Sequence, residues 1–200
     1  MPLRTVGGGL DVSTGMLAEA RKRQQEQRLT NVTWLEGAAE QLPFPDASFS
    51  IVTCRVAPHH FDSVPQFLAE VHRVLRPGGR FLLADTSVPD NKPELNQWQN
   101  YVEKLRDPSH ARNLEPREWQ AALEMAGLQV EKIEEAAPDG AMQLNDWLEK
   151  AGCTGATADL VRQEFRQASA EAQREFQIRE LPDADFTFVW QRVVAKAVKP

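Results

Sequence analysis

The feature that most constrains the fold of this chain is the alternation of short apolar segments with longer amphipathic ones. The short segments read as strands and span 31–37, 49–57, 79–88 and 128–136. The longer segments read as helices and span 64–75, 93–106, 116–126 and 155–175. Strands that alternate with helices are typical of an α/β fold, in which a mainly parallel sheet carries helices on both faces.

The segment 64–75 has the clearest helical pattern. Apolar side chains recur there at intervals of three and four residues, which places them on one face of a helix. They are Val64, Phe67, Leu68, Val71, Val74 and Leu75. The sequence RPGG at 76–79 is expected to end this helix, because proline cannot continue it and glycine adopts the left-handed conformation beyond its end.

The C-terminal segment DFTFVWQRVVAKAV, residues 185–198, is rich in β-branched and aromatic residues on both faces. A strand with this pattern belongs inside a sheet, so we expect 185–198 to form the last strand. Residues 137–176 contain the turn sequences APDG and AGCTGAT and are expected to be an insertion, or lid, before that strand. No linker divides the chain, so 1–200 is expected to form a single domain.

The N-terminal segment RTVGGGLDVSTGMLAEARKR, residues 4–23, combines two signals that usually belong to different strands. Glycines between a strand and a helix indicate a phosphate-binding loop. An acid at the end of a strand, here Asp11, indicates a carboxylate that binds ribose hydroxyls. One interpretation is that Gly7–Gly9 form a degenerate phosphate loop. The interpretation that we favour is that they form a flexible lead into the segment that follows.

Composition excludes several classes of function. The net charge is −6 and Lys and Arg are not clustered, which argues against nucleic-acid binding by phosphate neutralisation. No stretch approaches the roughly 20 apolar residues of a membrane span. The two cysteines, Cys54 and Cys153, lack metal-ligand spacing, so a reducing, cytoplasmic location is expected and no metal site is predicted.

Three stretches together carry a resemblance to a known family. They are LDVSTGMLAEARKR, LTNVTWLEGAAEQLPFPDASFSIVTCRVAPHHF and FLAEVHRVLRPGGRFLLAD, which begin at residues 10, 29 and 67. The chain resembles the class I S-adenosylmethionine-dependent methyltransferases, and most of all the small-molecule (type 11) group related to ubiquinone and menaquinone biosynthesis. The resemblance implies a Rossmann-like sheet with an antiparallel last strand.

The resemblance also places Asp11 at the end of the family's second strand, because the third strand follows in register. The family's first strand, its glycine loop and the next helix therefore have no counterpart, so we expect an N-terminal truncation of at least about 20 residues. In the family the absent strand lies in the middle of the sheet. Its loss leaves two open strand edges, which recruit other chains. We therefore expect a homodimer, with Val12, Val52 and Cys54 near its interface; the alternative is that the second strand pairs directly with the fourth in a compact monomer.

Five residues are implied in cofactor binding by the resemblance: Asp11, Val12, Ala38, Ala39 and Arg55. Asp11 would accept hydrogen bonds from the ribose, although an Asp at this position also suits helix capping together with Ser13. Ala38 stands where the family usually has an Asp that reads the adenine amino group. This change removes about 1–2 kcal/mol, or roughly tenfold in affinity. Together with the absent glycine loop, it predicts that S-adenosylmethionine binds weakly or not at all.

Three histidines are the candidate substrate-binding residues: His59, His60 and His110. Imidazole is able to orient a hydroxyl or take its proton near neutral pH. The competing interpretation is that His59 or His60 only hydrogen-bonds to backbone beside Phe61. No catalytic residue is assigned, because methyl transfer depends mainly on alignment.

Among the remaining reactive and aromatic side chains, Cys54 is expected to be buried and inert. Trp98, Trp119 and Trp147 are expected to lie in the core.

Three functions follow from these observations. The first is methyl transfer from S-adenosylmethionine to a small molecule. The second is a non-catalytic, truncated relative that acts through self-association. The third is a nicotinamide-dinucleotide enzyme, since Asp11 also suits a ribose there; the sequences GAAEQLPFPDASFS and VLRPGG argue against it.

Overall fold

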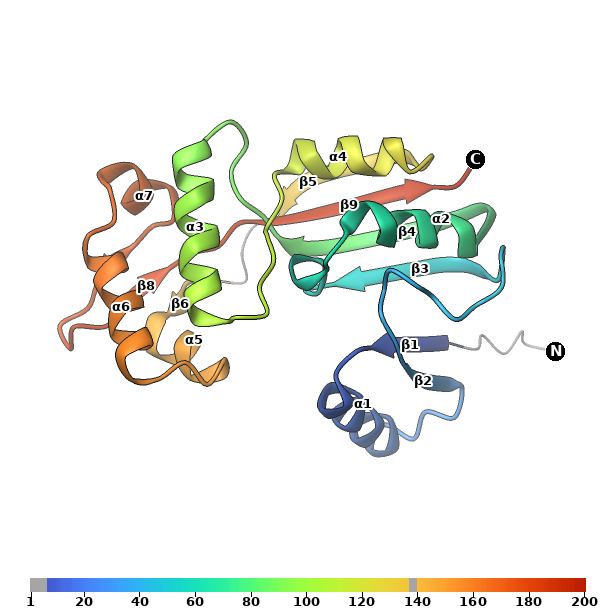
Figure 1. Cartoon of the computed structure of the whole chain (residues 1–200), viewed down its shortest axis with the longest axis horizontal. Coiled ribbons are helices and arrows are strands. Elements are labelled where there is room, and N and C mark those ends of the chain that lie inside the picture. The colour runs from blue at the N-terminus through green and yellow to red at the C-terminus, as the bar shows by residue number, and fades with distance from the viewer. Residues whose placement is uncertain (1–6, 137–139) are drawn as a thin grey trace.

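The computed structural model describes residues 7–136 and 140–200 (Figure 1). Residues 4–6 and 137–139, where the expected N-terminal segment and the expected insertion begin, lie outside the described residues. The described elements form a two-stranded sheet, a four-stranded sheet and a mostly helical part with a small three-stranded sheet. This arrangement is an α/β fold, as the alternating pattern predicted.

The four-stranded sheet has the order β3-β4-β9-β5. Strands β3 (Phe49–Arg55) and β4 (Leu75–Thr86) are parallel, and β9 (Arg192–Val198) runs antiparallel to both β4 and β5 (Gln129–Ala136). The antiparallel last strand is thus confirmed, and it lies inside the sheet.

Helices α2 (Val64–Val74) and α4 (Pro116–Met125) contact each other and cover one face of this sheet. The core between them includes Phe81 and Leu83 of β4, which point to the covered face because alternate residues of a strand share a face. The opposite face is open around Ile51 and Leu82, which are 55% and 38% exposed. Helix α2 ends where the sequence indicated, and Gly78 of RPGG has the left-handed conformation, with a φ of 73°.

The glycines at 7–9 are part of a strand, so the expectation of a flexible lead was wrong, and so was the degenerate loop. Strand β1 (Gly7–Asp11) pairs in parallel with β2 (Val32–Glu36), and helix α1 (Thr14–Glu26) connects them. A Cβ atom on Gly9 would lie 2.2 Å from the ring of Trp34. The glycine is therefore needed because a neighbouring strand places an aromatic ring over its backbone.

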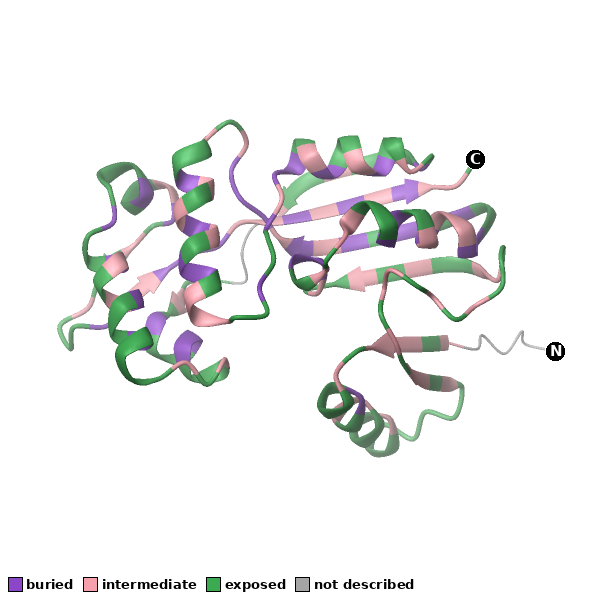
Figure 2. Cartoon of the chain, viewed as in Figure 1, coloured by how far each residue is buried: buried purple, intermediate pink, exposed green. Residues whose placement is uncertain are grey.

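The two sheets do not pair with each other among the described residues. Within residues 7–136 and 140–200, strand β1 has only β2 as a partner and β3 has only β4, so no described strand pairs with the facing edges of β1 and β3. Figure 1 shows the two strands running in the same direction, and Figure 2 shows mostly intermediate or exposed residues along both. The alternative in which the second strand pairs directly with the fourth is therefore wrong.

The helical part comes mainly from the expected insertion but extends beyond it. It contains α3 (Pro93–Arg106), β6 (Met142–Gln143), α5 (Leu144–Lys150), α6 (Gly155–Arg166), α7 (Ala170–Glu175), β7 (Arg179–Glu180) and β8 (Phe186–Phe188). The helix expected over 155–175 is divided because Ser169 caps a new helix, its hydroxyl accepting the N–H of Ala172 at 3.1 Å.

The single strand expected over 185–198 is also divided. Strand β8 pairs with β6 and β7, whereas β9 belongs to the four-stranded sheet. Phe188 and Trp190 pack in an aromatic core with Trp98, Trp147 and Phe165. The apolar residues on both faces of 185–198 thus serve two separate cores and not the two faces of one sheet. The expected burial of the three tryptophans is confirmed, with Trp98 partly buried and Trp119 in the other core.

Candidate functional site

The carboxyl ends of β1, β3 and β4 point toward the helical part of the molecule (Figure 1). Ligands of open α/β sheets bind at such ends. Asp11 is the last residue of β1, and Arg55 is the last residue of β3. Asp85 is the last residue but one of β4. This edge therefore holds the predicted residues and is the candidate site.

The adenosine-binding candidates lie together at the end of the two-stranded sheet. The backbone N–H of Gly37 donates to the carbonyl oxygen of Asp11 at 3.1 Å, which brings Ala38 and Ala39 beside Asp11. Asp11 Oδ1 accepts the N–H of Ser13 at 2.8 Å, and the Ser13 hydroxyl accepts the N–H of Met16. Ser13 is thus the residue that caps α1, and Asp11 stabilises the turn before it.

Two of the predicted cofactor residues are less closely tied to this group. Val12 is 68% exposed and packs little. Arg55 is exposed and lies on β3 of the four-stranded sheet, whereas Asp11 lies on β1 of the separate two-stranded sheet. The structure therefore groups Asp11, Ala38 and Ala39 and leaves Arg55 apart from them.

The three predicted histidines are brought together, and the centre of the group is a His–Asp pair. His59 lies on a short 3₁₀ helix, Pro58–His60, that follows β3. Its Nδ1 donates to Asp85 Oδ1 at 2.7 Å, and its backbone N–H donates to Asp85 Oδ2 at 3.1 Å. Asp85 is 1% exposed. A buried carboxylate that accepts two hydrogen bonds from one residue fixes both the position and the tautomer of its ring.

Residues 107–112 lie against this pair. The backbone N–H groups of Ala111 and Arg112 both donate to the carbonyl oxygen of His59, at 2.7 and 3.1 Å. These bonds bring His110 close to His59, and the centroids of their two rings lie 5.7 Å apart. The ring centroid of His60, the next residue in the chain, lies 4.2 Å from that of His59. Residues 107–112 are thus anchored to His59 through its backbone carbonyl oxygen.

The other two histidines each have one nitrogen held by a polar partner. The Ser109 hydroxyl donates to Asp107 at 2.6 Å, so His60 Nδ1 must donate to the Ser109 oxygen at 3.0 Å. His110 Nε2 donates to Asn100 Oδ1 at 2.9 Å. Its Nδ1 is buried and has no hydrogen-bond partner among the described residues.

The three rings differ in electrostatic environment. Burial lowers the pKa of His59, but its hydrogen bond to Asp85 and the charges of Asp85, Glu103 and Asp107 outweigh burial, so the pKa is raised. Burial and the neighbouring His59 lower the pKa of His60. The same causes lower the pKa of His110 to about 4. One histidine is thus prepared to take a proton while its two neighbours stay neutral.

Two acidic residues of this site were not predicted. Asp85 had a usable signal, because it is an acid at the end of an apolar run, just as Asp11 is. Glu103 had none, since it lies in the middle of α3. Burial raises the pKa of Glu103 to about 7. Burial, followed by the charge of Asp85, raises the pKa of the Cys54 thiol to about 12, in agreement with the expected inertness of that cysteine.

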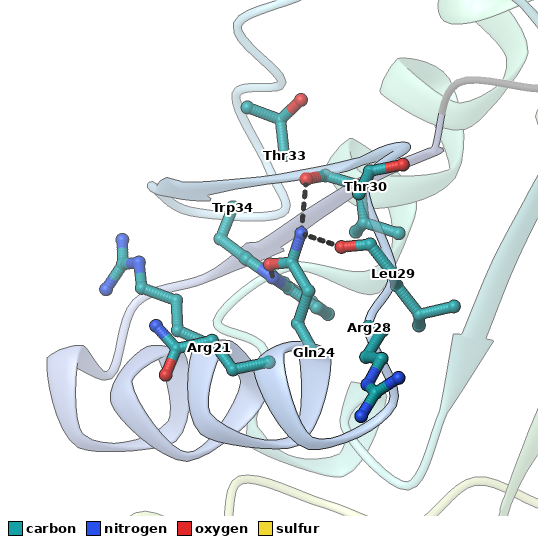
Figure 3. Close-up of a pocket in the computed structure, with 9 residues that line it drawn as sticks. Arg21, Gln24, Arg28, Leu29, Thr30, Thr33 and Trp34 are labelled. Carbon is teal, nitrogen blue, oxygen red and sulfur yellow. Dashed lines mark hydrogen bonds between the residues drawn. The ribbon is translucent and has the colours of Figure 1, made fainter.

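A hollow on the surface lies elsewhere, between α1 and β2 (Figure 3). It has a volume of about 510 Å³. Gln24 crosses it, donating to the carbonyl oxygens of Leu29 and Val32 and accepting the indole N–H of Trp34 at 2.6 Å. These contacts fix the connection between α1 and β2, and the hollow contains none of the predicted site residues.

Within residues 7–136 and 140–200, no group of three or more His, Cys, Asp or Glu side chains is arranged to hold a metal ion. None of the described helices combines the length and apolar composition that crossing a membrane requires.

Comparisons with known proteins agree with this fold. The chain is 38% identical over 168 residues to the uncharacterized methyltransferase YcgJ of Bacillus subtilis, covering 84% of this chain and 65% of that protein. It is 32% identical over 154 residues to the demethylmenaquinone methyltransferase of Listeria welshimeri, covering 74% of this chain and 64% of the relative. The chain thus spans slightly less than two thirds of the length of these two relatives.

A solved structure gives the same result in three dimensions. The crystal structure of a putative methyltransferase from Bacillus halodurans superposes with a TM-score of 0.90 at 32% identity, covering 96% of this chain and 82% of that one. An α/β sheet with an antiparallel last strand and its polar residues at the carboxyl ends defines a Rossmann-like methyltransferase fold. The profile of a family described as a methyltransferase domain matches residues 7–83. The chain belongs to the class I S-adenosylmethionine-dependent methyltransferases of type 11.

Proposed function

We propose that this chain takes part in the methylation of a small molecule with S-adenosylmethionine as the methyl donor. The observation that carries the proposal is the gathering of His59, His60 and His110 at the carboxyl edge that also holds Asp11. This edge is where an α/β fold binds its ligands. The demethylmenaquinone methyltransferase among the relatives supports a small-molecule acceptor.

The residues present fit only one end of the cofactor. Oδ2 of the Asp11 carboxylate has no hydrogen bond among the described residues. This oxygen is therefore able to accept a hydrogen bond from a ribose hydroxyl. Ala39 follows Gly37, whose N–H donates to the carbonyl oxygen of Asp11, by two residues, and we propose that its backbone N–H binds the adenine ring. Ala38 offers no carboxylate to the adenine amino group. The free edges of β1 and β3 leave the methionine end without a backbone wall among the described residues.

We therefore propose that S-adenosylmethionine binds this chain weakly. When bound, the cofactor supplies an electrophilic methyl group. The role of the chain's own residues is to bind the adenosine through Asp11 and Ala39 and to place the acceptor beside the histidines. A cytoplasmic location remains a prediction from the composition.

Isothermal titration calorimetry with S-adenosylmethionine tests the cofactor proposal. We expect a dissociation constant well above the low micromolar range for the unmodified chain. Asp11→Ala should abolish any binding, whereas Glu26→Ala, which removes an exposed acid from the neighbouring helix α1, should not. Saturable low-micromolar binding that Asp11→Ala abolishes would contradict the proposal of a weakened site.

Self-association is the second candidate function, and a specific observation favours it. The edges of β1 and β3 are both unpaired among the described residues, and Ile51 and Val12 are 55% and 68% exposed near them. Open strand edges with exposed apolar side chains recruit further strands. We propose a homodimer with Val12, Val52 and Cys54 near its interface. Light scattering after size exclusion decides the matter: a single species at the 22.5 kDa monomer mass at every concentration would exclude it.

A further inference from the structure

We propose that the hollow between α1 and β2 is a binding site for a small aromatic anion, either an aryl phosphate or an aryl carboxylate. The hollow is lined by the C-terminal half of α1, by the loop that follows and by the start of β2. None of the residues assigned to the cofactor or to the methyl acceptor lines it. The hollow is therefore a second ligand site, which is independent of the methyltransferase function proposed above.

The charge of the hollow is opposite to that of the whole chain. Arg21 and Arg28 line it and no acidic residue does, although the chain carries a net charge of −6. Neither guanidinium has a hydrogen bond or an ion pair among the described residues. By contrast, Arg23, which lies between them in the sequence, donates to Glu19 at 3.1 Å. Two unpaired guanidinium groups favour an anion, since each presents a planar set of donors that fits a carboxylate or a phosphate.

The backbone conformation of Arg28 is unfavourable for an arginine. The helix α1 ends in a Schellman motif, in which the N–H of Leu29 donates to the carbonyl oxygen of Gln24 at 3.0 Å. The N–H of Arg28 donates to Gln25 at the same distance, and Arg28 has a φ of 54°. Glycine adopts this left-handed conformation freely, whereas a residue with a side chain is strained there. The arginine thus weakens the turn and adds an unpaired charge to the hollow, which a bound anion would offset.

The apolar part of the hollow suits a flat ring. Trp34 lines it together with Leu29, which is 43% exposed. Gln24 fixes the indole by accepting its N–H at 2.6 Å, and the Gln24 amide donates in turn to the carbonyl oxygens of Leu29 and Val32. The ring of Trp34 is therefore held in place before a ligand arrives, which lowers the entropy cost of binding. Aromatic rings and guanidinium groups both pack well against another flat ring.

The size and the layout of the hollow fit one small molecule. Its volume of about 510 Å³ lies within the range of about 300–1,000 Å³ that is usual for small-molecule sites. Figure 3 shows Arg21 and Arg28 on opposite sides of Gln24, so an anionic group at either end of a ligand has a guanidinium on its own side. Thr30 and Thr33 also line the hollow, and their hydroxyl groups are further hydrogen-bond donors.

Nuclear magnetic resonance of the Trp34 indole N–H tests the proposal on the full chain, with 2-naphthyl phosphate and 2-naphthoate as probes. We expect at least one probe to shift this signal saturably, and the tighter of the two tells a phosphate from a carboxylate ligand. The controls are 2-naphthol, which has the ring without the anion, and inorganic phosphate, which has the anion without the ring. Each control should bind at least about tenfold more weakly.

Variants of the two arginines test the source of the affinity. Arg21→Gln and Arg28→Gly should each weaken binding of the probe about tenfold or more, because each removes charge-assisted hydrogen bonds. Lys22→Gln is the matched control, since it removes the same charge from α1 but does not line the hollow, and it should leave the affinity unchanged. Asp11→Ala should also leave it unchanged, which separates this site from the candidate cofactor site.

Thermal unfolding of Arg28→Gly separates binding from folding. We expect its Tm to equal or exceed that of the wild type, because glycine suits the left-handed position, while its affinity for the probe falls. A lower Tm together with lost binding would show that Arg28 acts through the fold and would overturn its role as an anion ligand.

The proposal as a whole is overturned by any of three results. They are the lack of a saturable shift of the Trp34 signal with both probes, equal binding of 2-naphthol, and unchanged affinity in both arginine variants. These measurements need no S-adenosylmethionine, so a chain that fails to bind the cofactor in calorimetry still tests the hollow, and an empty hollow leaves the methyltransferase proposal intact.

Discussion

Replacing Gly9 by alanine tests the finding that the glycine run is a strand packed under Trp34. The added Cβ would lie 2.2 and 2.4 Å from two ring carbons of Trp34, far inside van der Waals contact. The ring cannot move aside freely, because its N–H donates to Gln24, whose amide is held in turn by the carbonyl oxygens of Leu29 and Val32 (Figure 3). Overpacking of this kind costs about 1–3 kcal/mol.

Gly8→Ala is the matched control, because a Cβ at Gly8 meets Phe44 at an ordinary 3.5 Å. Neither glycine has a positive φ, so alanine is able to adopt both conformations. Both variants gain about 0.4–1 kcal/mol from a less flexible unfolded chain. The difference between the two variants therefore isolates the clash and should amount to about 1–3 kcal/mol.

Hydrogen exchange of the Trp34 indole N–H is the appropriate assay, because β1 and β2 form a separate sheet that is able to open without global unfolding. We expect exchange to be about 5- to 150-fold faster in Gly9→Ala than in Gly8→Ala. Equal protection in the two variants would refute the packing of Trp34 over Gly9, and would restore the interpretation of the glycines as a flexible lead.

Three further predictions concern the site and the free strand edges. Ala38→Asp should strengthen binding of S-adenosylmethionine roughly tenfold in calorimetry, because it restores a carboxylate for the adenine amino group; an unchanged affinity would place the adenine elsewhere. Burial raises the pKa of Glu103 from 4.5 to about 7. As the pH rises, the unfolded chain therefore loses this proton at a lower pH than the folded chain does, and the free energy of unfolding should fall between about pH 4.5 and 7. The loss is at most about 3 kcal/mol, and urea unfolding of Glu103→Gln should show a smaller loss over that range than the wild type. Ile51→Lys should shift the homodimer toward monomer in light scattering, because it places a charge on the free β3 strand; Glu26→Lys, on exposed α1, is the control that should leave the mass unchanged.

Most strands and helices of the fold could be predicted because their patterns are local. The apolar spacing of 64–75 depends only on the helical period, and the helix α2 occupies Val64–Val74. Two of the wrong assignments involve patterns whose cause lies elsewhere in the chain. The glycines at 7–9 form a strand because Trp34 covers them, and 185–198 is divided because its two halves pack in different cores.

The candidate site shows the same division between local and distant causes. The histidines were recognised as candidates from their residue type and from their place after a strand. Their shared position could not be predicted, since the carbonyl oxygen of His59 meets the N–H groups of Ala111 and Arg112 about fifty residues further along the chain. Glu103 gave no signal in the sequence, because nothing local distinguishes a buried acid in a helix from an exposed one.

The amino-acid sequence by itself determined the α/β class, the order of the elements, the methyltransferase resemblance and the placement of Asp11 at the end of a strand. These properties depend on hydrophobic period and on neighbouring residues, which any short segment carries with it. Only the tertiary structure decided that β1 and β3 have free edges, that the last segment joins two sheets, and that Asp85 holds His59. Strand pairing and hydrogen bonds between distant residues produce these features, and their energies depend on which segments meet in space.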